Sequence, residues 1–301
     1  MNRLYLIIII GIVSLSSLSS ANDSKLTNPY VPSYPFKSAV IYYTGMNEYG
    51  HGKSFQSKEV LYIQGDKLAK VTKMTVPDPK AKGKTKYIET LQIFDPDYVY
   101  MVNLTDKIGT KIENSNKYTI QAYDKLSDKE KEAFHKRMDL RGITSPDLPG
   151  LGKKIGTDTI LGKQCDVYES GKKVNGEELL NMVESGDVGN YFYKKSWIWR
   201  DSNIPLKELT NTFGQSNEIT ATKIEENVKI PDNQFKVNSK IKVTFDEEKS
   251  EFSKKDAMAR FNHFKTGNPI VLRMKLKEKK LPGKANPVTS DATQKSNQSQ
   301  D

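Results

Sequence analysis

The chain has 301 residues, of which 36% are hydrophobic and 28% are charged, and its formal net charge is +10. Its single cysteine cannot form an intrachain disulfide, which excludes the disulfide-rich class of small secreted domains. Stability therefore has to come from a hydrophobic core, and a chain of this length can bury one in a single large β domain or in two small domains.

Residues 1–21 have the three parts of a cleavable secretory signal peptide. Arg3 supplies the positive charge, Leu4–Val13 forms an apolar run, and Ser14–Ala21 is small and polar. The alternative is a membrane anchor, but this run is shorter than the roughly 20 residues that cross a bilayer, and no later segment is apolar enough. We expect cleavage after Ala21 and a periplasmic location. A lipoprotein is excluded because the only cysteine, Cys165, is far from that site.

From residue 38 onward, short segments rich in β-branched and aromatic residues alternate with turns that contain glycine, proline or aspartate. The strands do not alternate with helices as in a parallel sheet, so we predict a mostly antiparallel one. The expected strands are residues 38–44, 59–64, 67–76, 87–94, 98–104, 118–123, 157–161, 164–169, 191–200, 206–213, 218–225, 240–245 and 270–274.

Three segments have the pattern of amphipathic helices, at residues 128–140, 176–183 and 254–265. Ser127 and Glu130 predict a capping box at the start of the first, because each side chain can satisfy a free backbone amide of the other. The expected fold class is mainly β with a few helices (α+β). The expected domain covers residues 38–275, between an irregular lead-in (residues 22–37) and a disordered basic and polar tail (residues 276–301).

Three segments carry a resemblance to a known family: ILGKQCDVYE at 160–169, WIWRDSNIPLKEL at 197–209 and VKIPDNQF at 228–235. Through the order of these three segments, residues 58–245 resemble the periplasmic lipoprotein-carrier superfamily, which comprises LolA/LolB-like proteins and their outer-membrane lipoprotein-sorting-like relatives. The resemblance implies a curved antiparallel sheet that forms an incomplete barrel, with helices covering its concave side. It also implies that acyl chains bind in the hollow between them.

The sequence contains no motif for catalysis, for a cofactor or for a metal. The three histidines, His51, His135 and His263, are not spaced as in a His-Glu-x-x-His motif, and we expect surface positions for the last two. Cys165 lies within an expected strand with no motif around it, so a buried, inert thiol is favoured over a nucleophile. We therefore expect a protein that is not an enzyme and needs no cofactor.

Large apolar side chains that share one face of a strand are the candidates for a ligand cavity. Tyr193, Trp197 and Trp199 share a face on the period of two residues, and they can either line a hollow or fill the core beneath a helix. The same two interpretations apply to the other candidates, which are Leu61, Ile63, Leu91, Ile93, Val99 and Met101.

Basic residues cluster at residues 275–280 and in the loop at residues 77–86, where the candidates for contact with an anionic surface are Lys80, Lys82, Lys84 and Lys86. A solvated, lysine-rich surface is the favoured interpretation, and an anionic partner is the other. Nucleic acid is not expected as a partner, because aromatic residues do not alternate with the basic ones in a stacking pattern.

Together these patterns predict a non-catalytic periplasmic protein that carries or binds a lipid or an acylated, lipoprotein-like ligand. The prediction depends on strands that are apolar on both faces, on the amphipathic helices and on the family resemblance. The alternative is a structural or assembly protein of the cell envelope that binds a partner protein or an anionic surface.

Overall fold

The computed structural model describes residues 26–49, 53–78, 81, 83–139, 152–171, 192–212 and 215–268. All of them belong to the first of two compact units, residues 1–270 and 271–301. The expected signal peptide, the expected helix at residues 176–183, the expected strand at 270–274 and the expected tail lie outside the described residues.

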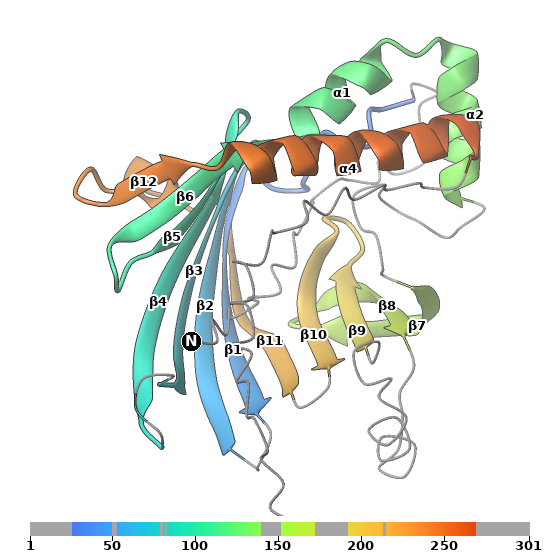
Figure 1. The fold of residues 1–301 in the computed structure, drawn as a ribbon. Coiled ribbons are helices and arrows are strands. Elements are labelled where there is room, and N and C mark those ends of the chain that lie inside the picture. Colours follow the sequence, from blue (N-terminus) through green and yellow to red (C-terminus); the bar gives the residue numbers. More distant parts are fainter. Residues whose placement is uncertain are drawn as a thin grey trace, which may run out of the picture. The chain divides into compact units, whose positions relative to one another are not determined.

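The described residues form one sheet of twelve strands (Figure 1). The strands are β1 (Ser38–Tyr49), β2 (Lys53–Gln64), β3 (Lys67–Pro77), β4 (Thr85–Phe94), β5 (Tyr98–Asn103), β6 (Ile108–Glu113), β7 (Lys153–Ile160), β8 (Lys163–Gly171), β9 (Phe192–Trp199), β10 (Ile204–Thr212), β11 (Gln215–Glu226) and β12 (Lys242–Phe245). Their order across the sheet is β12-β6-β5-β4-β3-β2-β1-β11-β10-β9-β8-β7.

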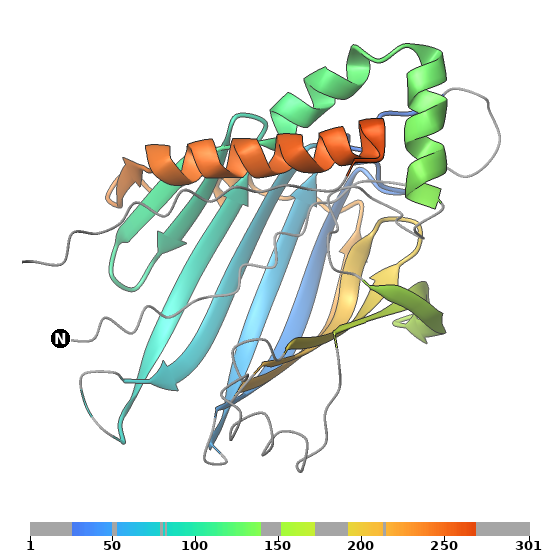
Figure 2. The ribbon, with the colours of Figure 1, turned by 45° about the vertical axis from the view of Figure 1, so that its right-hand side comes forward.

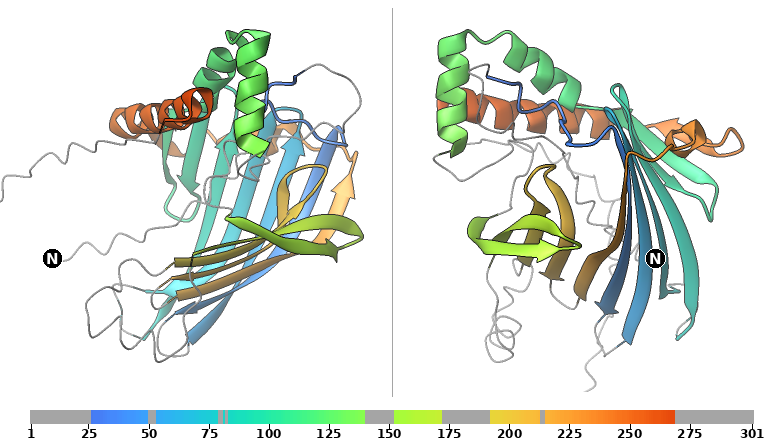
Figure 3. Two further views of the ribbon diagram at one scale, coloured as in Figure 1. Left: turned by 90° about the vertical axis from the view of Figure 1, so that its right-hand side faces the viewer. Right: turned by 180° about the vertical axis from the view of Figure 1, so that it is seen from behind.

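Neighbouring strands in the sheet are antiparallel, except that β12 pairs parallel to β6 at one edge. β1 to β6 form one meander, β7 to β11 form a second, and the two join where β1 pairs with β11. The sheet curves strongly but does not close, because β12 and β7 remain at its two edges (Figure 3). The expected mainly β fold with an incomplete barrel is confirmed.

The segment at residues 118–123, which we expected to be a strand, belongs instead to the helix α1 (Asn116–Asp124). Thr119 and Tyr123 are both buried and lie four residues apart, a spacing that places two side chains on one face of a helix. The hydroxyl of Thr119 also donates to the carbonyl oxygen of Asn116 at 2.9 Å. The β-branched and aromatic composition of the segment favours a strand, and packing overrides that local preference.

The extent of the predicted strands differs from the structure in two further ways. β6 forms although its sequence, IGTKIE, has a weak strand pattern, because β5 pairs with it along its whole length. β1 and β2 extend further than expected, to Tyr49 and back to Lys53, because their backbones stay paired beyond the apolar stretch. Pairing with a neighbour, rather than local composition, therefore decides where these strands end.

The helices α1, α2 (Asp128–Asp139) and α4 (Glu247–Thr266) lie on the concave side of the sheet, across one end of it (Figure 2). Side chains from the helices and from the segment before β1 form the helix cluster, which consists of Tyr30, Tyr123, Leu126, Phe134, Met138, Phe261 and Phe264.

The capping box before α2 is confirmed, since the amide of Ser127 donates to the Glu130 carboxylate at 2.9 Å and the amide of Glu130 donates to the Ser127 hydroxyl at 3.4 Å.

α4 begins several residues before the expected helix at residues 254–265. The side chain of Asp246 accepts a hydrogen bond from a backbone amide of the first turn, and acidic residues follow in that turn, where they interact favourably with the helix dipole. The helix ends at Gly267, whose φ of 81° is the left-handed conformation of a C-cap. The amide of Glu113 in β6 donates to the hydroxyl of Ser250 at 3.0 Å, which holds α4 to the sheet.

The segment before β1, residues 26–37, contacts both the helices and the sheet. Asn28 donates a hydrogen bond to Asp124 of α1 at 2.8 Å, and the side-chain amide of Asn116 donates to the carbonyl oxygen of Tyr30 at 2.9 Å. Further along, the centre of the Phe36 ring lies 5.5 Å from that of Trp199 in β9. This irregular segment therefore connects the helix cluster to the concave face.

Candidate functional site: a pocket on the concave face of the sheet

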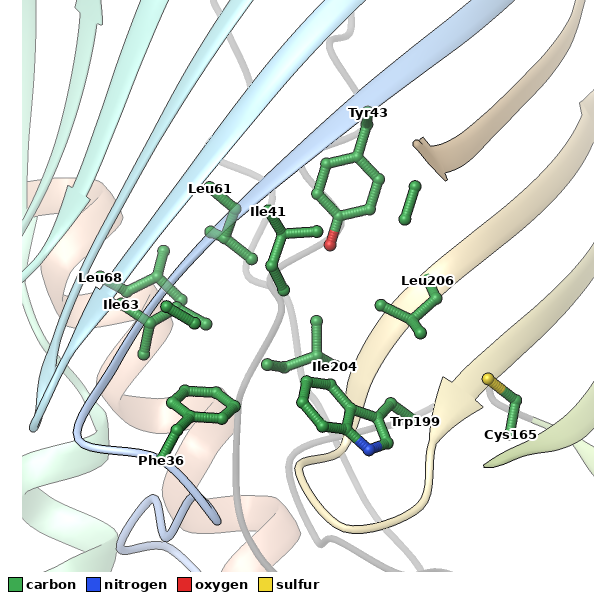
Figure 4. Packing of buried hydrophobic residues seen from close by; sticks show 12 residues of the cluster. Phe36, Ile41, Tyr43, Leu61, Ile63, Leu68, Cys165, Trp199, Ile204 and Leu206 are labelled. Carbon is green, nitrogen blue, oxygen red and sulfur yellow. The ribbon is translucent and has the colours of Figure 1, made fainter. Parts of the chain in front are cut away.

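The concave face carries a cluster of buried side chains at the end nearest the helices (Figure 4). This concave cluster consists of Phe36, Ala39, Ile41, Tyr43, Leu61, Ile63, Leu68, Cys165, Trp199, Ile204, Leu206 and Ala221. Curvature brings Leu68 of β3 and Cys165 of β8 into one cluster, although five strands lie between them in the sheet. Phe36 and Tyr34, whose rings stack with centres 5.2 Å apart, pack on it from the segment before β1. This end of the concave face is therefore filled by side chains.

A pocket opens next to the concave cluster. It is lined by Tyr43, Glu59, Leu61, Leu68, Lys70, Gln92, Phe94, Pro205, Glu208 and Ile219. Its volume is about 40 Å³, which is room for a few water molecules at about 10–15 Å³ each. The pocket can therefore hold a small polar group as it stands, whereas an acyl chain needs side chains to move.

Strand register divides the concave face around the pocket into rows that change from apolar to polar. Residues paired across neighbouring strands point to the same face of a sheet, so each row lies side by side on the concave face. Starting at the helix end, the rows are Ile63–Leu68–Phe94, Leu61–Lys70–Gln92 and Tyr43–Glu59–Thr72. An amphiphile laid along this face meets hydrocarbon at one end and polar groups at the other.

Two β-bulges lie beside the pocket and aim its side chains. One interrupts the pairing of β1 with β11 between Tyr42 and Tyr43, and the other interrupts β10 with β9 between Pro205 and Lys207. A bulge changes which face the following side chains occupy and increases the local twist. The extra residues are Thr222 in β11 and Leu206 in β10, so the change of facing falls on these two strands. Tyr43 lies in β1, which pairs with β2 without interruption, and its hydroxyl donates to the carbonyl oxygen of Pro205 at 3.0 Å.

The charged groups of the pocket form ion pairs that are largely shielded from water. Lys70 Nζ lies 3.6 Å from Glu59 Oε2, and the two side chains are 24% and 17% exposed. Glu208 Oε1 lies 2.6 Å from Nζ of Lys194. Burial raises the pKa of Tyr43 well above its usual value, and the nearby carboxylates of Glu59 and Glu208 raise it further. Tyr43 therefore keeps its phenolic proton and acts as a hydrogen-bond donor.

Gln92 is the one pocket residue with a buried side-chain polar atom that lacks a partner among the described residues. Its Oε1 is buried and accepts no hydrogen bond. A buried carbonyl oxygen without a donor costs roughly 1–3 kcal/mol relative to a satisfied one. The pocket thus contains an acceptor that a bound molecule could satisfy.

The cavity candidates from the sequence fall in different places. Leu61 lines the pocket, Ile63 and Trp199 belong to the concave cluster, and Trp197 packs against that cluster. Tyr193 is buried, and its hydroxyl donates to Glu169 at 2.6 Å. The structure therefore brings Leu61, Ile63 and Trp199 together and leaves Tyr193 outside the pocket.

The remaining candidates divide between the two faces of the sheet. Leu91 and Ile93 belong to an outer cluster, on the opposite face, with Ala69 and Val102. Val99 and Met101 are half-buried and pair with Phe94 and Gln92, which places them on the face of the pocket, although they do not line it.

The basic loop is described only in part. Lys80 and Lys82 lie outside the described residues, while Lys84 is exposed and Lys86 is half-buried. Of the residues that line the pocket, only Leu61 was a candidate from the sequence. The polar ones that sequence reasoning missed are Tyr43, Glu59, Lys70, Gln92 and Glu208, and the others are Leu68, Phe94, Pro205 and Ile219. A signal exists for Gln92, which is the one polar residue in the last four residues of β4, LQIF.

The described part of the chain contains little that could support chemistry. It holds no group of three or more His, Cys, Asp or Glu side chains that could bind a metal ion. Cys165 is buried, and burial raises the pKa of its thiol to about 11, so the thiol stays protonated near neutral pH. None of the helices in the described ranges is long and apolar enough to cross a membrane.

Comparison with known proteins gives no match to a family model and no match to a curated protein. An uncharacterized conserved protein from Thermus thermophilus aligns with 70% of this chain and 92% of its own, with 5% identity and a TM-score of 0.36. Lipoprotein LppX from Mycobacterium tuberculosis aligns with 65% of this chain and 91% of its own, with 14% identity and a TM-score of 0.26.

A LolA superfamily protein from Nitrosomonas europaea is also among the similar structures. It aligns with 68% of this chain and 92% of its own, with 8% identity and a TM-score of 0.24. The structural neighbours thus include a member of the superfamily that the sequence resembles. TM-scores this low carry no functional conclusion, which has to come from the pocket itself.

Proposed function

We propose that the protein binds a lipid or an acylated molecule on the concave face of its sheet and carries it without chemical change. The observation that supports this is the position of the pocket, at the boundary between an apolar row and two rows with polar groups. Ligand sites combine mostly apolar walls with a few polar groups that fix orientation. A molecule with a hydrocarbon chain and a polar head fits that boundary.

The acyl chain has to enter the concave cluster, because the pocket alone is too small for it. Two of the rings packed there, Tyr34 and Phe36, belong to the irregular segment before β1 and not to the sheet. Their displacement leaves the strand hydrogen bonds intact. We therefore infer that the chain takes the place of these rings, and that the apolar contact it gains offsets the contact that they lose.

The first test is to purify the protein from the periplasm, its expected location, and to examine it by native mass spectrometry and lipid extraction. We expect a co-purifying amphiphile, and binding of an environment-sensitive fatty probe once that amphiphile is removed. The proposal is wrong if no lipid co-purifies and the stripped protein does not bind the probe.

A matched pair of variants locates the binding to one face. Ile219 is half-buried and lines the pocket, whereas Val60 is half-buried on the opposite face of the sheet. Ile219→Gln adds a polar amide to the apolar wall and should weaken probe binding roughly tenfold, because burying an unpaired amide costs about 1–3 kcal/mol. Val60→Gln should leave binding unchanged. Equal effects of the two substitutions would place the probe elsewhere.

The second candidate is an assembly protein of the cell envelope, and the exposed edge of the sheet favours it. Of the eight residues of β7, seven are exposed, and β7 is the last strand in the order. An open edge offers backbone groups to a strand of a partner. If the basic surfaces bind the partner, deletion of residues 281–301 together with neutralisation of Lys80, Lys82, Lys84 and Lys86 should abolish a crosslinked complex. An unchanged complex argues against the basic surfaces and leaves the β7 edge as the contact.

A further inference from the structure

We propose that the pocket selects amphiphiles with a neutral polar head that offers at least one hydrogen-bond donor and at least one acceptor, as a glycerol monoester does. This inference rests on the proposed lipid binding and specifies its ligand class. It comes from three properties of the pocket: a buried acceptor without a donor, a lysine ammonium group that can donate further hydrogen bonds, and half-buried charges that balance each other.

The need for a donor comes from Gln92. Gln92 lines the pocket, and its Oε1 is buried and accepts no hydrogen bond from the described residues. A ligand hydroxyl or N–H placed in the pocket regains the bond that this oxygen lacks. A head without a donor, such as a simple ester, leaves the oxygen unsatisfied, as it is in the ligand-free protein.

The need for an acceptor comes from Lys70, which is paired with Gln92 across β3 and β4. Its Nζ lies 3.6 Å from Glu59 Oε2, which is an ion pair but is longer than a hydrogen bond. An ammonium group has three protons to donate, so Lys70 can bind a carbonyl oxygen of the ligand while it remains beside Glu59. Lys70 and Gln92 then hold the two ends of one small head.

The preference for a neutral head follows from the charges around it. Glu59 faces Lys70, and Glu208 faces Lys194, so two carboxylates and two ammonium groups balance each other. Their side chains are between 17% and 24% exposed, so water screens them poorly. A net charge on the ligand head would stay uncompensated in this environment, and burying such a charge is costly.

The test compares three ligands with the same ten-carbon acyl chain in competition with the fatty probe. They are 1-decanoylglycerol, which has an acceptor and donors, methyl decanoate, which has the acceptor alone, and decanoate, which is an anion without a donor. We expect 1-decanoylglycerol to bind roughly tenfold more tightly than methyl decanoate, as one regained buried hydrogen bond implies. Decanoate should bind no more tightly than the methyl ester.

Gln92→Leu removes the acceptor and provides the decisive variant. It should erase the tenfold preference for the glyceride while methyl decanoate binds as before. Gln56→Leu, at an exposed position of β2, is the control and should keep the preference. Thermal unfolding of both variants verifies that each is folded.

Each result separates this inference from the proposed function. If all three ligands bind with equal affinity, if decanoate binds most tightly, or if the preference survives Gln92→Leu, the head-group inference is wrong and lipid binding stands. If none of the three displaces the probe and the probe itself does not bind, the proposed function fails first.

Discussion

The helix cluster and the pocket lie on the same side of the sheet, and they are built in opposite ways. At the centre of the helix cluster, Phe134 is 0% exposed and packs its ring against those of Tyr30, Tyr123, Phe261 and Phe264. The floor of the pocket instead holds Lys70 and Glu59 as an ion pair beside Gln92.

This difference separates stability from binding. Burying aromatic rings against one another contributes directly to the free energy of folding. Half-buried ion pairs and an unsatisfied amide oxygen contribute little or nothing to it, because their desolvation offsets their attraction. A structural core has no use for such groups, whereas a site that must recognise a polar head requires them.

The largest effect should come from the helix cluster. Phe134→Ala removes a ring from the centre of four others and should lower the free energy of unfolding by about 5 kcal/mol, the upper end for such truncations. Urea unfolding followed by circular dichroism measures it. Phe252→Ala, on α4 with its side chain 48% exposed, is the control and should change stability by about 0.5 kcal/mol or less. Similar losses in both variants would mean that the cluster is not the source of stability.

The next effect should come from the ring that joins the two regions. Phe36→Ala should lower the free energy of unfolding by about 3 kcal/mol, because the ring is buried but sits at the margin of the concave cluster. It should also tighten binding of a fatty probe, since the ring that occupies the place of the chain is gone. Val31→Ala, an exposed position in the same segment, should do neither. Weaker probe binding in Phe36→Ala would contradict the displacement of this ring by the chain.

Replacing a polar group that has its hydrogen-bond partners should lower the free energy of unfolding, and Asp166, outside the pocket, is such a group. Asp166, 10% exposed in its side chain, accepts hydrogen bonds from Lys154 at 2.9 Å and Arg200 at 2.8 Å. Burial raises the pKa of Asp166, but these two partners more than offset it, so the pKa lies below its usual value. Asp166→Asn should therefore cost about 2 kcal/mol at neutral pH.

The pH dependence of that cost follows from the lowered pKa. A carboxylate whose pKa is depressed by folding stabilises the native state above the pKa of the unfolded chain, about 4, and the stabilisation is lost as pH falls through the folded value. Unfolding curves of the native protein and of Asp166→Asn should thus differ at pH 7 and converge in strong acid. A constant difference at all pH values would assign the cost to packing instead.

The smallest effect should have the opposite sign. Gln92→Leu removes the unsatisfied oxygen and should raise the free energy of unfolding of the ligand-free protein by about 1 kcal/mol. The exposed Gln56→Leu should change it by about 0.5 kcal/mol or less. A loss of stability in Gln92→Leu would show that the amide makes a structural contribution, and the contrast between the two regions would disappear.

Much of the fold is predictable from the sequence because local patterns suffice for it. Alternation and turn residues locate most strands, and the reciprocal hydrogen bonds of Ser127 and Glu130 follow from their spacing alone. α1 is not predictable in this way. Its buried face depends on the helix cluster, to which Tyr30 and α4 contribute from distant parts of the chain.

The pocket is less predictable, because its residues are defined by register and not by composition. Whether Glu59 or Lys70 faces water or the concave side depends on pairing across several strands. The bulges change the facing of side chains along β11 and β10. Pro205 marks the second bulge in the sequence, because proline inside a sheet is confined to edges, strand starts and bulges, whereas the local sequence does not mark the first. Apolar candidates such as Leu61 could be named, whereas the polar groups beside them could not.

The junction of β1 with β11 also has a kinetic consequence. The hydroxyl of Ser38 donates to the carbonyl oxygen of Val228, a contact that spans 190 residues, and β1 and β11 pair along most of their length. Contacts between residues so far apart form slowly, because a long loop must close first, whereas the β1–β6 meander needs only short loops. Until β11 arrives, one side of β1 is an unpaired edge that can join another chain. A nascent or truncated chain that stops before β11 is therefore the form of this protein most prone to aggregate.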